Sequence, residues 1–313
     1  MHIISSNDLD KSEIYEIFEL ASTYENLFIK YRGCFKDQVL NTVFFQPSTR
    51  TRLSFSYAFS KLGGTTIGFS NKEESRSGNI SSETTADLSR IIDSYGDVFV
   101  ARSDNASDIY ELSENIDKPF INAGAGQEEH PTQAILDAYC IHKFCGRLEN
   151  LNILIVGNIA YRTINSLLLI ISKWKNNRVH IIKPDFYDFN SYFYENREKI
   201  KSKIKFYNSF DDFFKENKPS SIDIIYYEEL RSDKLNIDSA NSVFSEFLLN
   251  KDIALKFSPK TPILHPLPRT TISSRVDNLP NARYFEQARF GVFIRAAIFI
   301  HIFRKYNMLK AGC

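Results

Sequence analysis

Apolar and polar residues follow one another along the chain in two kinds of segment. Short apolar runs such as "LNTVFFQ" (40–46), "GDVFVAR" (96–102) and "NLNILIVGN" (150–158) are typical of buried strands. Longer segments between them carry apolar residues at the spacing of one helical face. Strands that alternate with helices predict parallel sheets covered by helices on both sides.

Capping residues mark the expected starts of helices in the first part of the chain. Asp8 or Asp10 is predicted to cap an N-terminal helix, because short acidic side chains accept hydrogen bonds from free backbone N–H groups. A later helix is predicted within 81–96, with Ser81 or Ser82 as its cap.

The alternation of strands and helices continues through the second half of the chain. A helix is predicted to begin near His130, and further strands are predicted within 178–184, 221–227 and 261–268. The last apolar helix, from about Phe290 onward, is expected to pack back on the first domain.

These elements predict an α/β fold with two doubly wound parallel-sheet domains. The first domain is predicted to comprise residues 1–135 plus 286–313, and the second residues 136–285. A chain of 313 residues has the length expected for two domains of ordinary size.

Composition narrows the classes of function. Hydrophobic residues make up 43% and charged residues 25% of the chain, as in globular proteins, and a net charge of +1 provides no global field to recruit nucleic acid or a membrane surface. The longest apolar runs are too short to span a bilayer, and the N-terminus is unlike a signal peptide. The cysteines form no CxxC pair, which predicts a reduced, cytoplasmic chain without a metal site; they are Cys34, Cys140, Cys145 and Cys313.

The stretch "QPSTRTRLSF" follows the apolar strand at 40–46 and opens a helix that is predicted to end near Gly63. If Ser48 caps this helix, free N–H groups of its first turn point toward the end of the strand. With the Thr49 and Thr51 hydroxyls and the Arg50 guanidinium they form a site suited to a phosphate. The alternative is an ordinary capped helix with solvated arginines.

Two later stretches also place donors or acceptors at element ends. His130 and Gln133 stand three residues apart at a helix start and share one face, although a histidine there is more often a cap or a core residue. In "HPLPR" (265–269), two prolines stiffen the loop and leave the carbonyl groups of Pro266 and Leu267 as acceptors for an ammonium or amide group. Alone, that loop would be read as a rigid turn.

Taken together, these motifs resemble the aspartate and ornithine carbamoyltransferase superfamily, and most closely its aspartate branch. The resemblance runs almost end to end, through "FFQPSTRTRLSF", "ETTADL", "HPTQAILD", "GRLENLNILIVGN", "HPLPR" and "FGVFIRAAI". It implies enzymes that use carbamoyl phosphate without a metal or cofactor. It also implies a homotrimer with active sites at the subunit interfaces. An ornithine-type enzyme is disfavoured because its "HCLP" loop is here "HPLP".

The resemblance assigns roles to residues of the donor site. It implies that Ser48, Thr49, Arg50 and Thr51 bind the phosphate of carbamoyl phosphate. The carbonyl oxygen would be held by Thr51 with two further residues, Arg102 and His130. Gln133 and the Pro266–Leu267 carbonyl groups would orient the amide. Arg50, Thr51, Arg102 and His130 are the implied catalytic residues.

The acceptor half departs from the family pattern. Arg162, in "GNIAYRT", matches the family's carboxylate-binding arginine, and Leu267 is implied on the acceptor side as well. Where the family has a second such arginine, this chain has Glu229, with Glu228 beside it and Arg231 two residues further on. Either Arg231 takes that role, or the acceptor side chain is not a carboxylate, or the register of the loop is shifted by two.

Two more departures concern the loop before "ETTADL" and the tie to the acceptor domain, while the donor-site motifs remain. The aspartate branch has a lysine, implied to cross from a neighbouring subunit, where this chain has Ser81, and Arg76 is the nearest cation that would replace it. Gln46 stands where that branch has a glutamate.

The sequence thus predicts a carbamoyltransferase that acts on a small amine or amino acid, with aspartate as the default acceptor. Two alternatives stay open: a carbamoyltransferase of a specialised pathway with another amine, and a non-catalytic relative that only binds carbamoyl phosphate. A dinucleotide-binding enzyme is poorly supported, because "IVGNIAYRT" lacks the required glycine spacing.

Overall fold

A computed structural model describes residues 2–74, 83–230, 245–309 and 313. The chain divides into two compact units: unit 1 is Met1–Leu136 with Arg289–Cys313, and unit 2 is Asp137–Ala288. The divisions fall inside two helices, α6 and α12.

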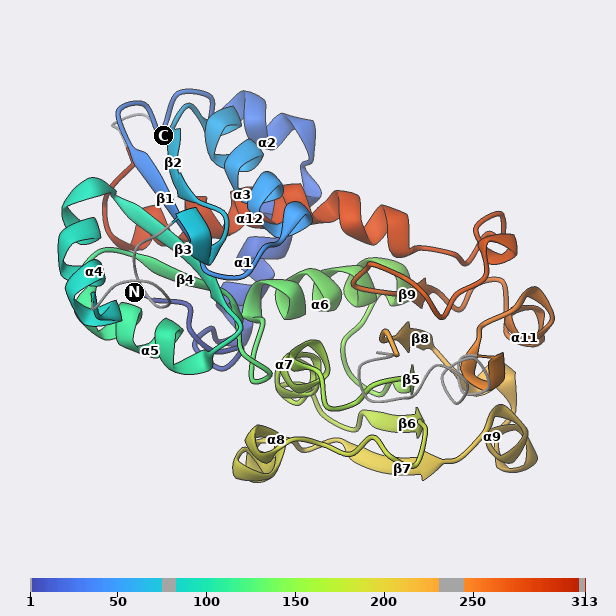
Figure 1. Ribbon diagram of the computed structural model, residues 1–313. Helices are drawn as coiled ribbons and strands as arrows, with labels where there is room; N and C mark the ends of the chain where they lie inside the picture. The colour runs from blue at the N-terminus through green and yellow to red at the C-terminus, as the bar shows by residue number, and fades with distance from the viewer. Residues whose placement is uncertain (1, 75–82, 231–244, 310–312) are drawn as a thin grey trace. The chain divides into compact units, whose positions relative to one another are not determined.

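Unit 1 contains, within the described residues, a four-stranded parallel sheet in the order β2-β1-β3-β4 (Figure 1). Its elements are α1 (Lys11–Ser22), α2 (Glu25–Lys30), β1 (Val39–Phe44), α3 (Thr49–Leu62), β2 (Thr65–Phe69), η1 (Lys72–Glu74), α4 (Thr85–Ile92), η2 (Asp93–Tyr95), β3 (Val98–Ser103), α5 (Ala106–Asn115), β4 (Phe120–Ala125) and the start of α6 (Pro131–Cys145).

Helices cover both faces of this sheet. On one face, α4 and α5 pack through Leu88 and Ile109 into a buried cluster that includes Phe99 of β3. On the other, Phe59 of α3 meets Phe299 of the C-terminal helix α12 (Tyr284–Lys305), with ring centroids 4.9 Å apart. The two layers fix the sheet, and with it the loops that leave its carboxyl edge.

Unit 2 contains, within the described residues, a five-stranded parallel sheet in the order β7-β6-β5-β8-β9 (Figure 1). Its elements are β5 (Asn152–Val156), α7 (Arg162–Ile171), β6 (Arg178–Ile182), α8 (Ser191–Glu195), η3 (Arg197–Lys199), β7 (Lys203–Tyr207), α9 (Phe210–Glu216), η4 (Pro219–Ser221), β8 (Ile224–Tyr227), α11 (Lys251–Lys256), β9 (Ile263–Leu264) and η6 (Ser274–Val276). Helix α7 is buried along its whole length. The predicted α/β class with two parallel-sheet domains is confirmed.

Local capping explains where the helices start. Asp10 caps α1 in a capping box with Glu13, as the sequence allowed. The predicted cap of α4 is wrong: Thr84 is the N-cap, and its hydroxyl accepts a hydrogen bond from the N–H of Asp87 (3.0 Å). Ser81 and Ser82 lie outside the described residues and are too early in the chain to cap a helix that begins at Thr85. In a run of hydroxyl residues, the acidic residue three positions ahead marks the cap better than the first serine.

The prediction of four reduced cysteines is also wrong. Cys34 and Cys313 form a disulfide with Cα atoms 5.9 Å apart, although 279 residues separate them in sequence. The folding of the C-terminal segment onto unit 1 brings the two together, and spacing rules for CxxC pairs cannot detect such a contact. Cys140 and Cys145 are free.

Candidate active site

In the unit 1 sheet, the direction in which successive strands are added changes between β1 and β3. The chain runs from β1 through α3 to β2 on one side, and then returns to place β3 on the other side of β1. In open parallel sheets, ligands bind at the carboxyl ends of the strands at such a switch point. The turn after β1 and the end of β3 therefore form the expected binding edge of unit 1.

Residues 48–51 form the turn at this edge, between β1 and α3. Ser48 is the N-cap residue of α3 by its backbone, but its side chain makes no capping hydrogen bond. The N–H groups of the first turn have no partner within the helix, and they carry the positive end of its dipole. Thr49 and Arg50 are exposed, whereas Thr51 is 6% exposed. The turn thus offers backbone donors, hydroxyl groups and a guanidinium group to an anion.

Arg102 ties the end of β3 to this turn. It is paired with Phe44 in the register of β1 and β3, and its carbonyl oxygen accepts the N–H of Phe45 at 2.9 Å. Its guanidinium is 9% exposed and donates to the carbonyl oxygen of Ala123 at 3.2 Å, which fixes its direction. A buried, oriented cation at the switch point is suited to stabilise negative charge on a substrate oxygen.

His130 and Gln133 lie at the start of α6, after β4. His130 is 4% and Gln133 7% exposed, and the carbonyl oxygen of His130 accepts the N–H groups of Gln133 and Ala134 at 3.0 and 3.1 Å. The His130 Nδ1 lies 3.4 Å from the Thr132 hydroxyl. Because β4 is the neighbour of β3, the structure brings this helix start to the same carboxyl edge as Arg102 and the 48–51 turn.

The unit 2 sheet has its own switch point, between β5 and β8, since β6 and β7 lie on one side of β5, and β8 and β9 on the other. Arg162 is the first residue of α7 on the β5 side, and it is 1% exposed, with its guanidinium 5.4 Å from the Tyr161 ring. Gly157 ends β5 with φ 118°, and a Cβ there would lie 2.1 Å from the Glu228 carbonyl oxygen. The two loops at this switch point are therefore packed backbone to backbone.

Glu228 follows β8 and is 3% exposed. Its carboxyl group accepts hydrogen bonds from the Thr163 hydroxyl and from the N–H of Glu229 (3.1 Å). Burial raises the pKa of Glu228 to about 8, because removal from water penalises the charged form more than these bonds favour it. Glu228 therefore carries a proton at neutral pH. Glu229 is half-buried.

The "HPLPR" loop leaves β9, and a buried network fixes its start. The N–H of His265 donates to Gln287 Oε1 (2.8 Å), and Gln287 Nε2 donates to Asp137 Oδ1 (2.6 Å). Asp137 also accepts the Tyr226 hydroxyl at 2.8 Å. All four groups belong to unit 2, so the loop is held to α6, β8 and α12 through one carboxylate.

The loop itself has a defined shape. The N–H of Leu267 donates to His265 Nδ1 (2.9 Å), Leu267 has φ 57°, and the Leu267–Pro268 peptide is cis. Pro266 and Leu267 are half-buried. Within the described residues, no donor bonds the Pro266 carbonyl oxygen.

Arg269 anchors the far end of the loop. Its two terminal nitrogens reach the two carboxylate oxygens of Asp277 at 2.5 and 2.6 Å, and its guanidinium lies 5.2 Å from the ring of Tyr284. Burial, with the Asp277 carboxylate next in size, raises the pKa of Tyr284. Arg269, the arginine of "HPLPR", therefore has a structural role, because its bidentate pair with Asp277 fixes the end of the loop.

The structure thus gathers the predicted residues into two groups, one in each unit. Gln46 lies beside the unit 1 group, where its N–H approaches the Arg102 carbonyl oxygen at 3.4 Å. Arg231, Arg76 and Ser81 lie outside the described residues. Sequence reasoning missed Thr163, Asp137 and Gln287 as positioning groups; a polar residue inside an apolar helix, as in "QAILD", was the available signal.

Comparisons with known proteins agree with these two groups. Residues 1–143 match the model of the aspartate/ornithine carbamoyltransferase carbamoyl-P binding domain, and residues 149–302 match that of the Asp/Orn binding domain. The aspartate carbamoyltransferase catalytic subunit of Wigglesworthia glossinidia brevipalpis is 36% identical over 97% of both chains. That of Thermoplasma volcanium is 33% identical over 96% of this chain and 97% of its own.

Solved structures are also similar along the whole chain. The catalytic subunit of M. jannaschii aspartate transcarbamoylase superposes with a TM-score of 0.86 at 31% identity, covering 98% of this chain and 99% of that one. Aspartate transcarbamoylase from Trypanosoma cruzi in complex with carbamoyl phosphate gives a TM-score of 0.82 at 29% identity, over 95% and 94% of the two chains. Sequence, fold and the two groups of residues together show that the chain belongs to the aspartate/ornithine carbamoyltransferase family, where it is similar to the catalytic subunits of aspartate carbamoyltransferases.

Proposed function

We propose that the chain transfers the carbamoyl group of carbamoyl phosphate to the amino group of aspartate and releases phosphate. Unit 1 is the carbamoyl-phosphate domain and unit 2 the acceptor domain. The observation that carries the proposal is the α3 start, where Ser48 leaves the first-turn N–H groups without a side-chain cap. A relative that is 29% identical has been solved with carbamoyl phosphate bound.

The donor site works by position and charge. The phosphate binds the first-turn N–H groups with the Ser48 and Thr49 hydroxyls and the Arg50 guanidinium. Thr51, Arg102 and His130 hold the carbamoyl oxygen, and Gln133 with the Leu267 carbonyl group orients the amide. As the amine attacks, the carbonyl oxygen gains negative charge that these fixed donors stabilise.

Collapse of the tetrahedral intermediate then breaks the bond between carbon and the phosphate oxygen. The electron pair leaves with phosphate, and phosphate accepts the proton that the attacking amine loses. No separate protein base is required in this scheme, and the rate gain comes from orientation and oxyanion stabilisation.

The acceptor site uses Arg162 as the carboxylate-binding cation. A buried arginine beside the unit 2 switch point supports this role. Glu228 does not oppose it at neutral pH, because its raised pKa leaves the group uncharged. The like-charge conflict expected from the sequence is thereby reduced to Glu229 alone.

A second candidate is the same reaction with another amine as acceptor. It is favoured by Glu229, an acidic residue next to the switch point, which would attract a cationic side chain and repel a carboxylate. A panel of amines tests both candidates: purified protein is incubated with labelled carbamoyl phosphate and each amine in turn. Turnover with aspartate at millimolar concentration excludes the second candidate.

The same assay separates an enzyme from a binding-only relative. If carbamoyl phosphate raises the melting temperature but no amine is carbamoylated, the catalytic proposal fails. The proposed homotrimer is tested independently by the solution mass of the protein, where a monomeric mass would contradict it.

A further inference from the structure

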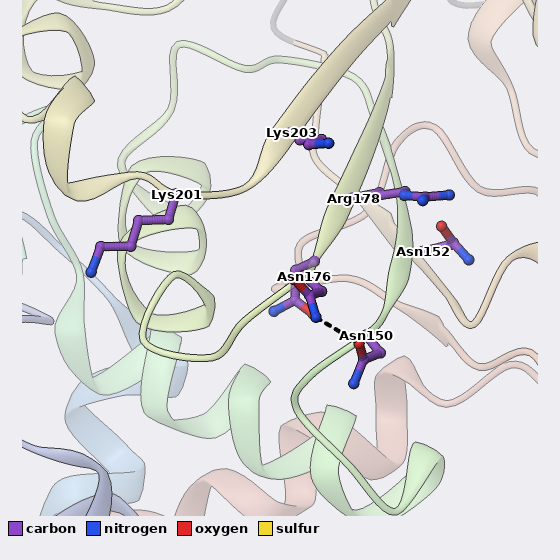
Figure 2. A pocket seen from close by; sticks show the side chains of 7 residues that line it. Asn150, Asn152, Asn176, Arg178, Lys201 and Lys203 are labelled. Atoms are coloured by element: carbon purple, nitrogen blue, oxygen red, sulfur yellow. Dashed lines mark hydrogen bonds between the residues drawn. The ribbon is translucent and has the colours of Figure 1, made fainter.

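A polar hollow of about 430 Å³ lies at the amino edge of the unit 2 sheet (Figure 2). All of its lining residues are asparagines or cations: Asn150, Asn152, Asn176, Asn177, Arg178, Lys201 and Lys203. Arg162 and Glu228 follow the carboxyl ends of β5 and β8, so this basic hollow lies at the opposite end of the same sheet.

Strand register gathers the charges of the basic hollow. Asn152, Arg178 and Lys203 are the first residues of β5, β6 and β7, and they are paired side by side across the three strands. Residues paired in this way point to the same face of a sheet, and neighbouring strands are about 4.8 Å apart. Two cations placed side by side repel each other unless an anion lies between them.

Carboxylates of the described residues do not neutralise these cations. Within the described residues, no Asp or Glu forms an ion pair with Arg178, Lys201 or Lys203. Lys205, two residues along β7, differs because it pairs with Glu216. Asp223, the acidic residue next to β8 at this edge, is bonded to Arg147 (2.6 Å) and to the N–H of Asn152 (2.8 Å).

The asparagines give the basic hollow a fixed floor. The side chain of Asn177 accepts the N–H of Leu151 (3.0 Å) and donates to the carbonyl oxygens of Leu148 and Ile171, which ties the β6 entry to the β5 entry. Asn176 Nδ2 donates to Asn150 Oδ1 at 3.1 Å, the dashed bond in Figure 2. The amide groups are therefore held in place before any ligand binds.

We propose that the basic hollow binds a small polyphosphate, either inorganic or carried by a nucleotide. Arg178 and Lys203, paired on neighbouring strands, supply a guanidinium and an ammonium group for two linked phosphoryl groups, and amide donors complete their coordination. The volume also exceeds the need of one phosphate and falls in the range of small-molecule sites.

Lys201 has a lesser part in this site. In Figure 2 its ammonium group extends away from Arg178 and Lys203. Arg178 and Lys203 are therefore the two residues whose loss tests the proposal, and both are exposed, so that their replacement leaves the core intact.

The test is calorimetric titration of the full chain with tripolyphosphate, adenosine triphosphate and inorganic phosphate, at low ionic strength. Tripolyphosphate is expected to bind more tightly than inorganic phosphate. The double variant Arg178→Ser/Lys203→Ser is expected to weaken tripolyphosphate binding by about tenfold or more, because charge-assisted hydrogen bonds are lost. Lys205→Ser, a matched loss of charge on the same strand, is expected to leave binding unchanged.

Several results would overturn the proposal. They are the absence of tripolyphosphate binding at millimolar concentration, equal affinity for inorganic phosphate, and unchanged binding by the double variant. Comparison of tripolyphosphate with adenosine triphosphate identifies the kind of ligand. Tighter binding of the nucleotide indicates that the asparagine amides contact the nucleoside, and equal binding indicates an inorganic ligand. The double variant keeps full carbamoyl transfer, since neither residue belongs to the proposed active site.

Discussion

The carboxyl edges of the two sheets each contain a switch point, but they differ in electrostatics. In unit 1 the switch point presents exposed donors on the 48–51 turn and an oriented, buried Arg102. In unit 2 the switch point combines the buried Arg162 with a carboxyl group, Glu228, that burial keeps protonated at neutral pH. One edge is built to meet an anion at any working pH, whereas the charge of the other depends on a proton.

This difference matches the contrast predicted from the sequence, between a donor side that keeps the family pattern and an acceptor side that departs from it. The donor-side motifs stand on main-chain features, a helix start and strand ends, that any sequence with the same fold retains. The acceptor side depends on individual side chains, so a single replacement such as the one predicted at Glu229 would change its character.

Arg50→Ala is expected to have the largest effect. Removal of the guanidinium group from the 48–51 turn should lower kcat/KM for carbamoyl phosphate by about 100- to 1000-fold, since the loss of one preorganised donor costs that much. Steady-state kinetics and calorimetric binding of carbamoyl phosphate measure it. The control is Arg90→Ala, which removes an exposed arginine of α4 that pairs with Asp87 at 3.9 Å. Unchanged donor affinity in Arg50→Ala would contradict the donor site.

Gly157→Ala should disturb the carboxyl edge of the unit 2 sheet and leave the donor site of unit 1 unchanged. A Cβ at φ 118° would lie 2.1 Å from the Glu228 carbonyl oxygen, so that either the β5 or the β8 loop must move. We expect a loss of about 2–4 kcal/mol in the free energy of unfolding, together with a higher KM for the amine. Gly146→Ala is the control, because it also has positive φ but its Cβ would meet no atom within 4 Å. Chemical denaturation of both variants shows whether the loss of stability comes from the contact with the Glu228 carbonyl oxygen or from the positive φ alone.

Glu228→Gln should remove a pH dependence of the free energy of unfolding. Between about pH 4.5 and 8, the folded chain keeps a proton on Glu228 that the unfolded chain loses, so wild-type stability falls as pH rises. The slope approaches about 1.4 kcal/mol per pH unit. The glutamine variant should lack this slope and exceed the wild type in stability above pH 8. An equal slope in both proteins, measured by denaturation across pH, would show that Glu228 is ionised. Glu198→Gln, at an exposed carboxyl group, serves as the control.

Arg269→Lys should produce the smallest effect of the four. The charge remains, but the bidentate contact with Asp277 is reduced to a single bond, so the "HPLPR" loop loosens. We expect kcat/KM to fall by about tenfold with little change in melting temperature. A change in melting temperature without a change in kinetics would assign Arg269 to folding only.

The fold was predictable where burial and periodicity agree. The strand that became β1 and the helix α3 were visible because an apolar run is followed by a segment that is free of Gly and Pro up to Gly63. Strand β7 was not predicted, since it is an edge strand with exposed Lys203 and Lys205 alternating with apolar residues, and burial gives it little signal.

The candidate site was predictable as a set of residues but not as chemistry. Ser48, Arg102 and His130 were assigned to one site by the family resemblance, because each stands in one of its motifs. The proton on Glu228 depends on burial, which outweighs the opposing effect of the Thr163 hydrogen bond, and no local pattern encodes that balance. The Cys34–Cys313 disulfide has the same origin, because it joins residues that only the tertiary fold brings together.

The most direct measurement of the central claim is a crystal structure of the protein with carbamoyl phosphate. The account predicts phosphate density at the first turn of α3, against the N–H groups of residues 49–51 and the Arg50 guanidinium group, with the carbamoyl oxygen toward Arg102 and His130. A structure with the donor bound elsewhere, or with this turn empty at saturating donor, would contradict it.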